Sequence, residues 1–174
     1  MDRREVVRRA LTRLVLTASV ATVPAPAVPA SRHEPRPLPV FVKGAVKRAV
    51  ALAREKLQSE ECRAIYTDFL DGQGHPLAAR LELIGTTPRE HLGHLRWVNG
   101  AELRTCQDPD IYFATVVGGI RVHVCPEQFA RFAIREPHKA AGLLLHEHLH
   151  SLGLGENPPT SDQITRQVWS RCGR

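Results

Sequence analysis

The sequence of 174 residues lacks the uninterrupted apolar run of about 20 residues that a membrane-spanning helix requires. It also has no internal repeat, so a repeat architecture is not expected. Hydrophobic residues make up 43% and charged residues 24% of the chain, a balance too apolar for intrinsic disorder. Because compact domains cluster at about 100–150 residues, the length predicts one domain.

The N-terminus has the order of a secretory signal peptide. Residues 1–13 carry five arginines, and an uncharged, mostly apolar run follows at 14–23. This run is too short to span a membrane and leads into a segment of alanines and prolines. These features predict a signal peptide over residues 1–30, cleaved after Ala30 or alternatively after Ala27.

The predicted signal carries half of the net charge. Removing residues 1–30 would reduce 24 basic and 18 acidic residues to 19 and 16, and the formal charge from +6 to +3. The remaining arginines are scattered, so nucleic-acid binding is not expected. Residues 3–8 resemble a twin-arginine export signal, and an ordinary basic segment fits them equally well. We therefore expect an exported protein, secreted or in the periplasm or cell envelope, without stable membrane insertion after cleavage.

Cysteine is scarce, and its positions are informative. No cysteine precedes Cys62, which excludes a lipid-modified cysteine near the cleavage site. No C-x-x-C spacing supports zinc ligation by cysteine. Four cysteines in an exported chain are typical of two disulfides, for which three pairings are possible. We favour Cys106–Cys125 and Cys62–Cys172.

Hydrophobic spacing predicts a single α+β domain over residues 39–174, after a proline-rich leader at 31–38. Apolar residues recur at helical spacing over 39–60. Thr87 and Thr160 each begin a capping box and so start a helix. Further helices are expected at 76–84, 126–135 and 138–152.

Two glycine-containing turns predict the strands. Asn99-Gly100 and Gly118-Gly119 each lie between apolar segments and read as tight hairpins. Alternating apolar residues also occur around Cys62–Tyr66. We therefore expect a short, mostly antiparallel sheet of four strands between residues 94 and 125.

The chemically distinctive residues lie between positions 146 and 156. The segment contains His146-Glu147-x-x-His150, an HExxH motif, and small and apolar residues before it favour a helix. Positions i and i+4 of a helix share a face, so His146 and His150 can bind one Zn²⁺ at about 2 Å. Glu147 is offset from that face and can accept a proton from a zinc-bound water.

This motif resembles the active-site helix of the zincin metallopeptidases. H-E-x-x-H-x-x-G-x-x-E over 146–156 looks like the metzincin pattern, with Glu where that group usually has His and sometimes Asp. The resemblance implies a small zincin-like domain, zinc ligands at His146 and His150, a general base at Glu147 and a third ligand at Glu156. Gly153 can end the helix with a positive φ and turn the chain back toward the metal.

The chain departs from the metzincin pattern in a second respect. Its only methionine is Met1, so it has no Met-containing turn. The gluzincin pattern requires a third-ligand Glu on a later helix, and no Glu follows Glu156. Aspzincins instead use an Asp downstream of the motif. Asp162 is therefore the alternative third ligand, although an acid at this helix start also favours the helix dipole.

Three other histidines have plainer interpretations. His148 lies inside the motif but is rotated away from His146, so we expect it at the surface or beside the ligands. His91 and His94 are three residues apart on a predicted helix and could bind a metal, and partial solvation is the favoured interpretation.

Two functions follow from these observations. The resemblance implies an exported, monomeric zinc metallopeptidase that hydrolyses peptide or protein substrates. The alternative is a secreted zinc-stabilised binding module without turnover, in which a fourth ligand such as Asp162 closes the site.

Overall fold

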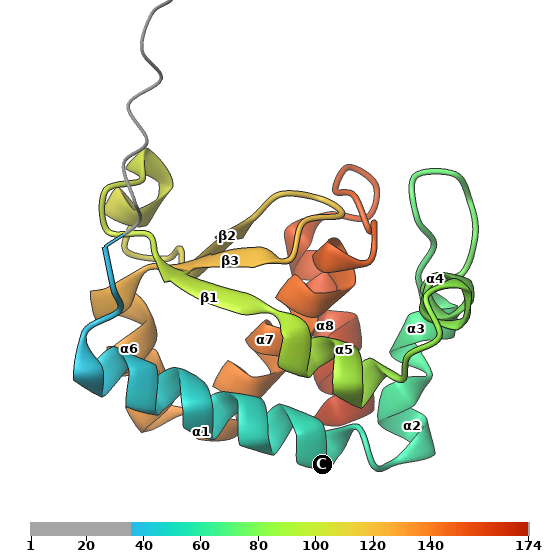
Figure 1. Ribbon diagram of the computed structural model, residues 1–174, viewed down its shortest axis with the longest axis horizontal. Helices are drawn as coiled ribbons and strands as arrows, with labels where there is room; N and C mark the ends of the chain where they lie inside the picture. The colour runs from blue at the N-terminus through green and yellow to red at the C-terminus, as the bar shows by residue number, and fades with distance from the viewer. Residues whose placement is uncertain (1–35, 174) are drawn as a thin grey trace, which may run out of the picture. The chain divides into compact units, whose positions relative to one another are not determined.

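The computed structural model describes residues 36–173, so the predicted signal peptide lies outside the described residues. The described chain is an α+β domain that combines helices with a small mixed sheet (Figure 1). In chain order its elements are α1 (Val40–Lys56), α2 (Glu60–Arg63), α3 (Ile65–Asp68), α4 (Leu77–Leu83), α5 (Pro88–His94), β1 (Arg96–Asn99), the 3₁₀ helix η1 (Arg104–Gln107), β2 (Phe113–Thr115), β3 (Arg121–Val124), α6 (Pro126–Arg135), α7 (Pro137–Ser151) and α8 (Ser161–Cys172).

Helix α7 lies at the centre of the packing. It contacts α1, α6, α8 and strand β2. Small and larger apolar residues of α7 belong to the core. Those that are fully buried are Ala140, Ala141, Leu144, Leu145 and Leu149. Burial on several sides therefore fixes the helix that carries the HExxH motif.

The sheet has three strands in the order β1-β3-β2, not the expected four. β2 pairs antiparallel with β3, which confirms the hairpin at Gly118-Gly119. β1 pairs parallel with β3, so the hairpin predicted at Asn99-Gly100 is wrong, and the sheet is mixed rather than mostly antiparallel. At that turn the Asn99 side chain accepts a hydrogen bond from the Ala101 amide at 2.9 Å. The chain then continues into η1 and reaches the other edge of the sheet.

The segment with apolar alternation around Cys62–Tyr66 is helical. The Ser59 hydroxyl accepts a hydrogen bond from the Cys62 amide at 3.1 Å and begins α2. The buried residues that follow, Cys62, Ile65, Tyr66 and Phe69, are spaced three or four apart, as on one face of a helix. The helical spacing of the buried residues, rather than the apolar alternation, therefore matches the structure of this segment.

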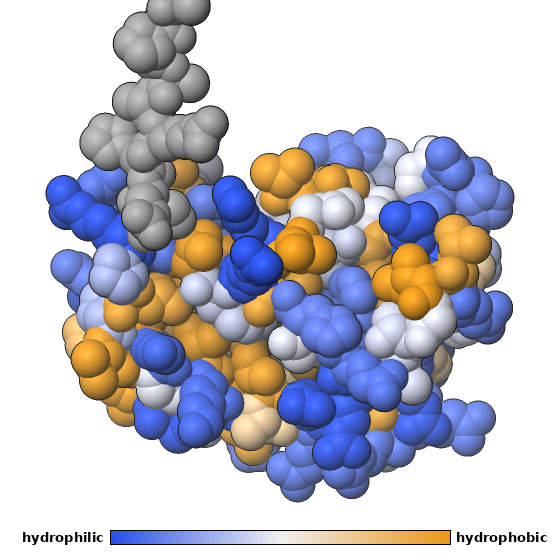
Figure 2. Space-filling model, viewed as in Figure 1, coloured by the Kyte–Doolittle hydropathy of each residue, from blue (hydrophilic) through white to orange (hydrophobic). Residues whose placement is uncertain are grey.

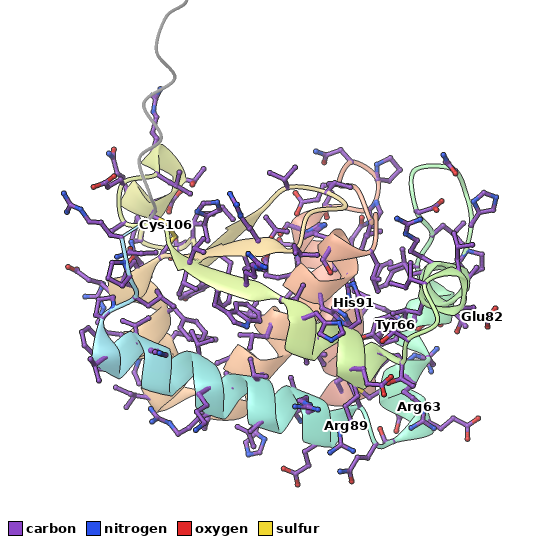
Figure 3. The ribbon with its side chains drawn as sticks, in the orientation of Figure 1. Arg63, Tyr66, Glu82, Arg89, His91 and Cys106 are labelled. Atoms are coloured by element: carbon purple, nitrogen blue, oxygen red, sulfur yellow. A yellow bond between two sulfur atoms is a disulfide. The ribbon has the colours of Figure 1, made fainter. Side chains whose placement is uncertain are left out.

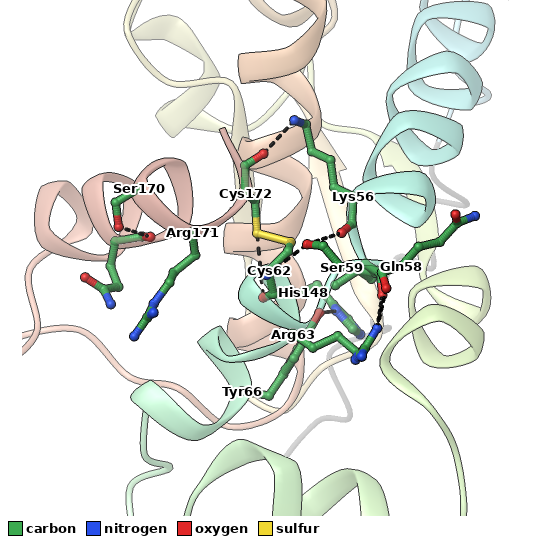
Figure 4. Close-up of a disulfide and its surroundings, with 12 residues drawn as sticks. Lys56, Gln58, Ser59, Cys62, Arg63, Tyr66, His148, Ser170, Arg171 and Cys172 are labelled. Carbon is green, nitrogen blue, oxygen red and sulfur yellow. Dashed lines mark hydrogen bonds between the residues drawn. A yellow bond between two sulfur atoms is a disulfide. The ribbon is translucent and has the colours of Figure 1, made fainter. Parts of the chain in front are cut away.

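The predicted helix starts and disulfides are present. Thr87 and Thr160 both form capping boxes, with Glu90 and Gln163 respectively. Cys62 is bonded to Cys172 and joins α2 to α8 (Figure 4). Cys106 is bonded to Cys125 and joins η1 to the start of α6. These are the two pairings that the sequence analysis favours, and disulfides are compatible with an exported protein.

Among the described helices, none combines the length and apolarity needed to cross a membrane.

Candidate metal centre

The last turn of α7 and the chain after it bring three potential ligands together. His146 and His150 lie one turn apart, with their Nε2 atoms 2.8 Å from each other. Gly153 then has a φ of +111°, a conformation that favours glycine, and reverses the chain. The carboxylate Oε1 of Glu156 comes to 3.3 Å from His150 Nε2 and 3.8 Å from His146 Nε2. The motif and the turn thus form one cluster of ligand atoms, all within 4.8 Å of one another.

Asp162, the alternative third ligand, is not part of this cluster. It lies exposed in the first turn of α8, where a carboxylate interacts favourably with the helix dipole. Among the described residues, Glu156 is the acid that joins the two histidines.

The hydrogen bonds behind the two imidazoles direct their Nε2 lone pairs into the cluster. His150 Nδ1 lies 2.8 Å from the Leu154 carbonyl oxygen, which only accepts, so Nδ1 carries the hydrogen and donates it. His146 Nδ1 lies 2.9 Å from the Thr165 hydroxyl oxygen and can donate to it in the same way. In the neutral tautomers that result, both Nε2 atoms carry lone pairs and no hydrogen.

This arrangement fits a bound cation. In these tautomers two imidazole lone pairs and a carboxylate oxygen converge within 4.8 Å. Such atoms repel one another, and a metal ion at their centre would turn the repulsion into coordination. Burial, followed by the neighbouring His150, lowers the pKa of His146 to about 3. His146 is therefore unprotonated at neutral pH and could bind a metal without first losing a proton.

Glu147 lies beside the cluster and does not belong to it. Its side chain is half-buried and lines two adjoining pockets, of about 270 and 460 Å³. Burial raises the pKa of its carboxyl group. The two pockets share His146, Glu147, Phe113, Ile111 and Ser161 and so form one groove across the cluster.

Strand β2 forms a wall of this groove. Within residues 36–173 it is an edge strand, because β3 is the one strand that pairs with it there. Phe113, Ala114 and Thr115 line the larger pocket. The Gly118 amide in the β2–β3 turn donates to the His150 carbonyl oxygen at 2.8 Å and fixes the hairpin to the end of α7. The unpaired backbone edge of β2 is therefore held next to the ligand cluster.

His148 differs from the expectation for it: it is fully buried, on the other side of α7 from the ligands. Its Nδ1 lies 2.7 Å from the Tyr66 hydroxyl oxygen and its Nε2 lies 2.8 Å from His91 Nδ1. Tyr66 and His91 enter from α3 and α5 (Figure 3). His91 is therefore buried too, whereas His94 is exposed. The spacing of His148 from Ala141, Leu144 and Leu145 places it on the apolar stripe of α7 and could have indicated its burial.

Two further hollows contain no comparable cluster. One, of about 450 Å³ and mainly apolar, lies between α1 and β1, where Figure 2 shows hydrophobic side chains at the surface. The other, of about 800 Å³, lies along α8, and its Asp68 carboxylate already accepts hydrogen bonds from Gln167 and Arg171. Within residues 36–173, His146, His150 and Glu156 are the one group of three side chains placed to hold a metal.

No protein-family model matches the chain, and no curated protein or solved structure is significantly similar to it. The function is therefore inferred from the site itself.

Proposed function

We propose that this protein is an exported zinc-dependent peptidase with a zincin-like domain. The observation that carries the proposal is the convergence of His146, His150 and Glu156 beside the Glu147 carboxyl group in an open groove. The two disulfides support export, since such bonds persist in oxidising compartments.

The donor atoms favour zinc over other common metals. Two imidazole nitrogens and one carboxylate oxygen suit Zn²⁺, whereas Mg²⁺ and Ca²⁺ prefer oxygen donors throughout. When bound, zinc would act as a Lewis acid that polarises a carbonyl and lowers the pKa of a coordinated water. Three protein ligands leave a coordination position open, as in catalytic zinc sites.

Glu147 supplies the proton transfer. Its carboxylate accepts a proton from the attacking water as the water oxygen bonds to the peptide carbonyl carbon. The protonated carboxyl group then donates that proton to the amine nitrogen as the C–N bond breaks. Burial raises the pKa of the Glu147 carboxyl group, which makes it a better proton acceptor than an exposed carboxylate. The free edge of β2 offers backbone groups that can align an extended peptide by β-augmentation.

The geometry favours the peptidase over a zinc-stabilised binding module. A structural zinc site is closed by four protein ligands. Asp162, the candidate for that fourth ligand, lies outside the cluster, and the groove at Glu147 is open to solvent.

Glu147→Gln tests the proposal. We expect the variant to bind one zinc ion per chain, as the unaltered protein does, because Glu147 is not a ligand. Its hydrolysis of a peptide library should fall by about 10²–10⁴-fold, the usual contribution of a general base. Elemental analysis and mass spectrometry of the products measure the two effects.

The matched control is Glu127→Gln, which neutralises an exposed carboxylate in the first turn of α6. It should retain both zinc and hydrolysis. If the unaltered protein binds no zinc, the proposal fails at its first step. Stoichiometric zinc without hydrolysis of any peptide would instead support the binding module.

A further inference from the structure

The smaller of the two pockets beside Glu147 has a mixed lining that suggests the substrate it selects. Its volume is about 270 Å³, the scale of one amino-acid side chain rather than of a larger ligand. Apolar and aromatic side chains from β2 and the residue before it, and from α6, α7 and α8, form its walls: Tyr112, Phe113, Phe132, Leu143 and Trp169. Tyr112 and Phe132 stack with their ring centroids 4.6 Å apart.

Two carboxylates complete the lining of the pocket. Asp110 precedes β2, and Asp162 lies in the first turn of α8. Both are exposed, and neither carboxylate has a hydrogen-bond or ion-pair partner among the described residues. The Asp108 carboxylate, by contrast, accepts a hydrogen bond from the Asp110 amide at 2.9 Å. The two unpaired carboxylates come from separate parts of the chain and line the same pocket.

Lys139, the cation recorded against the Trp169 ring, pairs with a different acid. Lys139 lies 5.9 Å from the centroid of the Trp169 ring and 3.6 Å from the Glu136 carboxylate. Its charge is therefore offset by Glu136. The described residues that line the pocket include the acids Asp110, Asp162 and Glu147 and no lysine or arginine.

On the basis of the proposed peptidase function, we propose that this pocket selects an arginine or lysine side chain next to the scissile bond. The aliphatic stem of such a residue packs on aromatic walls, as long cationic side chains commonly do. Its charged end meets the two carboxylates, and an arginine also gains from stacking on a tryptophan or tyrosine ring. The Glu147 carboxyl and His146, which line the same pocket, place the selected residue beside the reacting bond.

Hydrolysis of matched hexapeptides tests this inference. The peptides carry arginine, lysine, norleucine or glutamate at one position and are otherwise identical, with that position placed on either side of the scissile bond. We expect kcat/KM to be highest for arginine and lysine and lowest for glutamate. Asp110→Asn/Asp162→Asn should reduce the preference for arginine over norleucine by about three- to tenfold, as expected for two partly exposed charges. Glu82→Gln, an exposed substitution on α4 remote from the groove, should leave that ratio unchanged (Figure 3).

Binding without turnover provides a second measurement. In a Glu147→Gln/Trp97→Phe background, Trp169 is the remaining tryptophan. The arginine hexapeptide should change its fluorescence at a lower concentration than the norleucine hexapeptide does. Adding Asp110→Asn/Asp162→Asn should remove the difference.

The outcomes separate this inference from the proposed function. Cleavage without a basic preference, or a preference that survives Asp110→Asn/Asp162→Asn, overturns the inference and leaves the peptidase intact. If no peptide is cleaved, the fluorescence titration still decides: selective binding of the arginine peptide supports the inference, and equal binding overturns it.

Discussion

Helix α7 presents histidines in two opposite environments. On one side, His146 and His150 direct their Nε2 atoms toward each other and toward the Glu156 carboxylate. On the other side, His148 is fully buried, and each of its ring nitrogens faces one polar partner, Tyr66 or His91.

The difference lies in how the hydrogen-bonding capacity is satisfied. Around His148, donors and acceptors can alternate from Tyr66 to His91, so the group is complete without a ligand. In the tautomers that donate to Leu154 and Thr165, the atoms that His146, His150 and Glu156 turn toward one another are all acceptors, an arrangement that a cation would complete. Burial of a histidine therefore does not by itself indicate a site. The pattern of its partners separates a structural histidine from a candidate ligand.

The largest expected effect is the loss of metal binding in His150→Ala. Removing one of three ligands should lower zinc affinity by at least about a thousandfold, because two remaining donors cannot enclose the ion. Competition with a chromophoric chelator measures the affinity.

His94→Ala is the matched control, since His94 is exposed and lies outside the cluster. It should bind zinc as the unaltered protein does. Equal zinc affinity in His150→Ala and His94→Ala would contradict the assignment of His146, His150 and Glu156 as the metal site.

A smaller effect on zinc affinity is expected from Thr165→Val, which removes a hydrogen-bond partner of His146 and leaves the three ligands in place. The Thr165 hydroxyl oxygen lies 2.9 Å from His146 Nδ1 and orients the ring. Valine has nearly the same shape but offers no acceptor. Zinc affinity should fall by about 10–100-fold, as is typical when a hydrogen bond to a ligating histidine is lost.

Ser161→Ala provides the comparison for this variant. Ser161 lines the same groove but makes no contact with a ligand nitrogen in the hydrogen bonds of residues 36–173. Its zinc affinity should be unchanged. A fall of equal size in both variants would mean that the groove as a whole, rather than the Thr165 hydroxyl, determines affinity.

The side of α7 that carries His146 and His150, here called the open side, could largely be predicted from sequence because the residues that form its site are close together in the chain. His146, His150 and Glu156 lie within eleven positions, and a helix followed by a glycine turn is enough to bring them together. The capping boxes at Thr87 and Thr160 are local in the same sense.

The opposite side of α7, which carries the buried His148 and is here called the closed side, could not be predicted because the partners of His148 are distant in sequence. Tyr66 and His91 lie 82 and 57 positions from His148, and no periodic pattern links them to it. The parallel pairing of β1 with β3 was missed for a related reason. The Asn99-Gly100 dipeptide favours a hairpin locally, whereas the packing of β1 against β3 decides the register.

The smallest of these effects is expected on the closed side, from Tyr66→Phe. The substitution removes the hydroxyl 2.7 Å from His148 Nδ1 and leaves a fully buried ring nitrogen without its partner. An unsatisfied buried polar atom costs about 1–3 kcal/mol, so the free energy of unfolding should fall by about that amount in chemical denaturation. Tyr112→Phe, which removes a half-buried hydroxyl with no hydrogen bond to another described residue, should change it by less than about 0.5 kcal/mol. Zinc affinity should stay the same in both variants, because His146 and His150 keep their hydrogen bonds to Thr165 and Leu154. A Tyr66→Phe protein that lost zinc as readily as Thr165→Val would show that the two sides of α7 act as one unit.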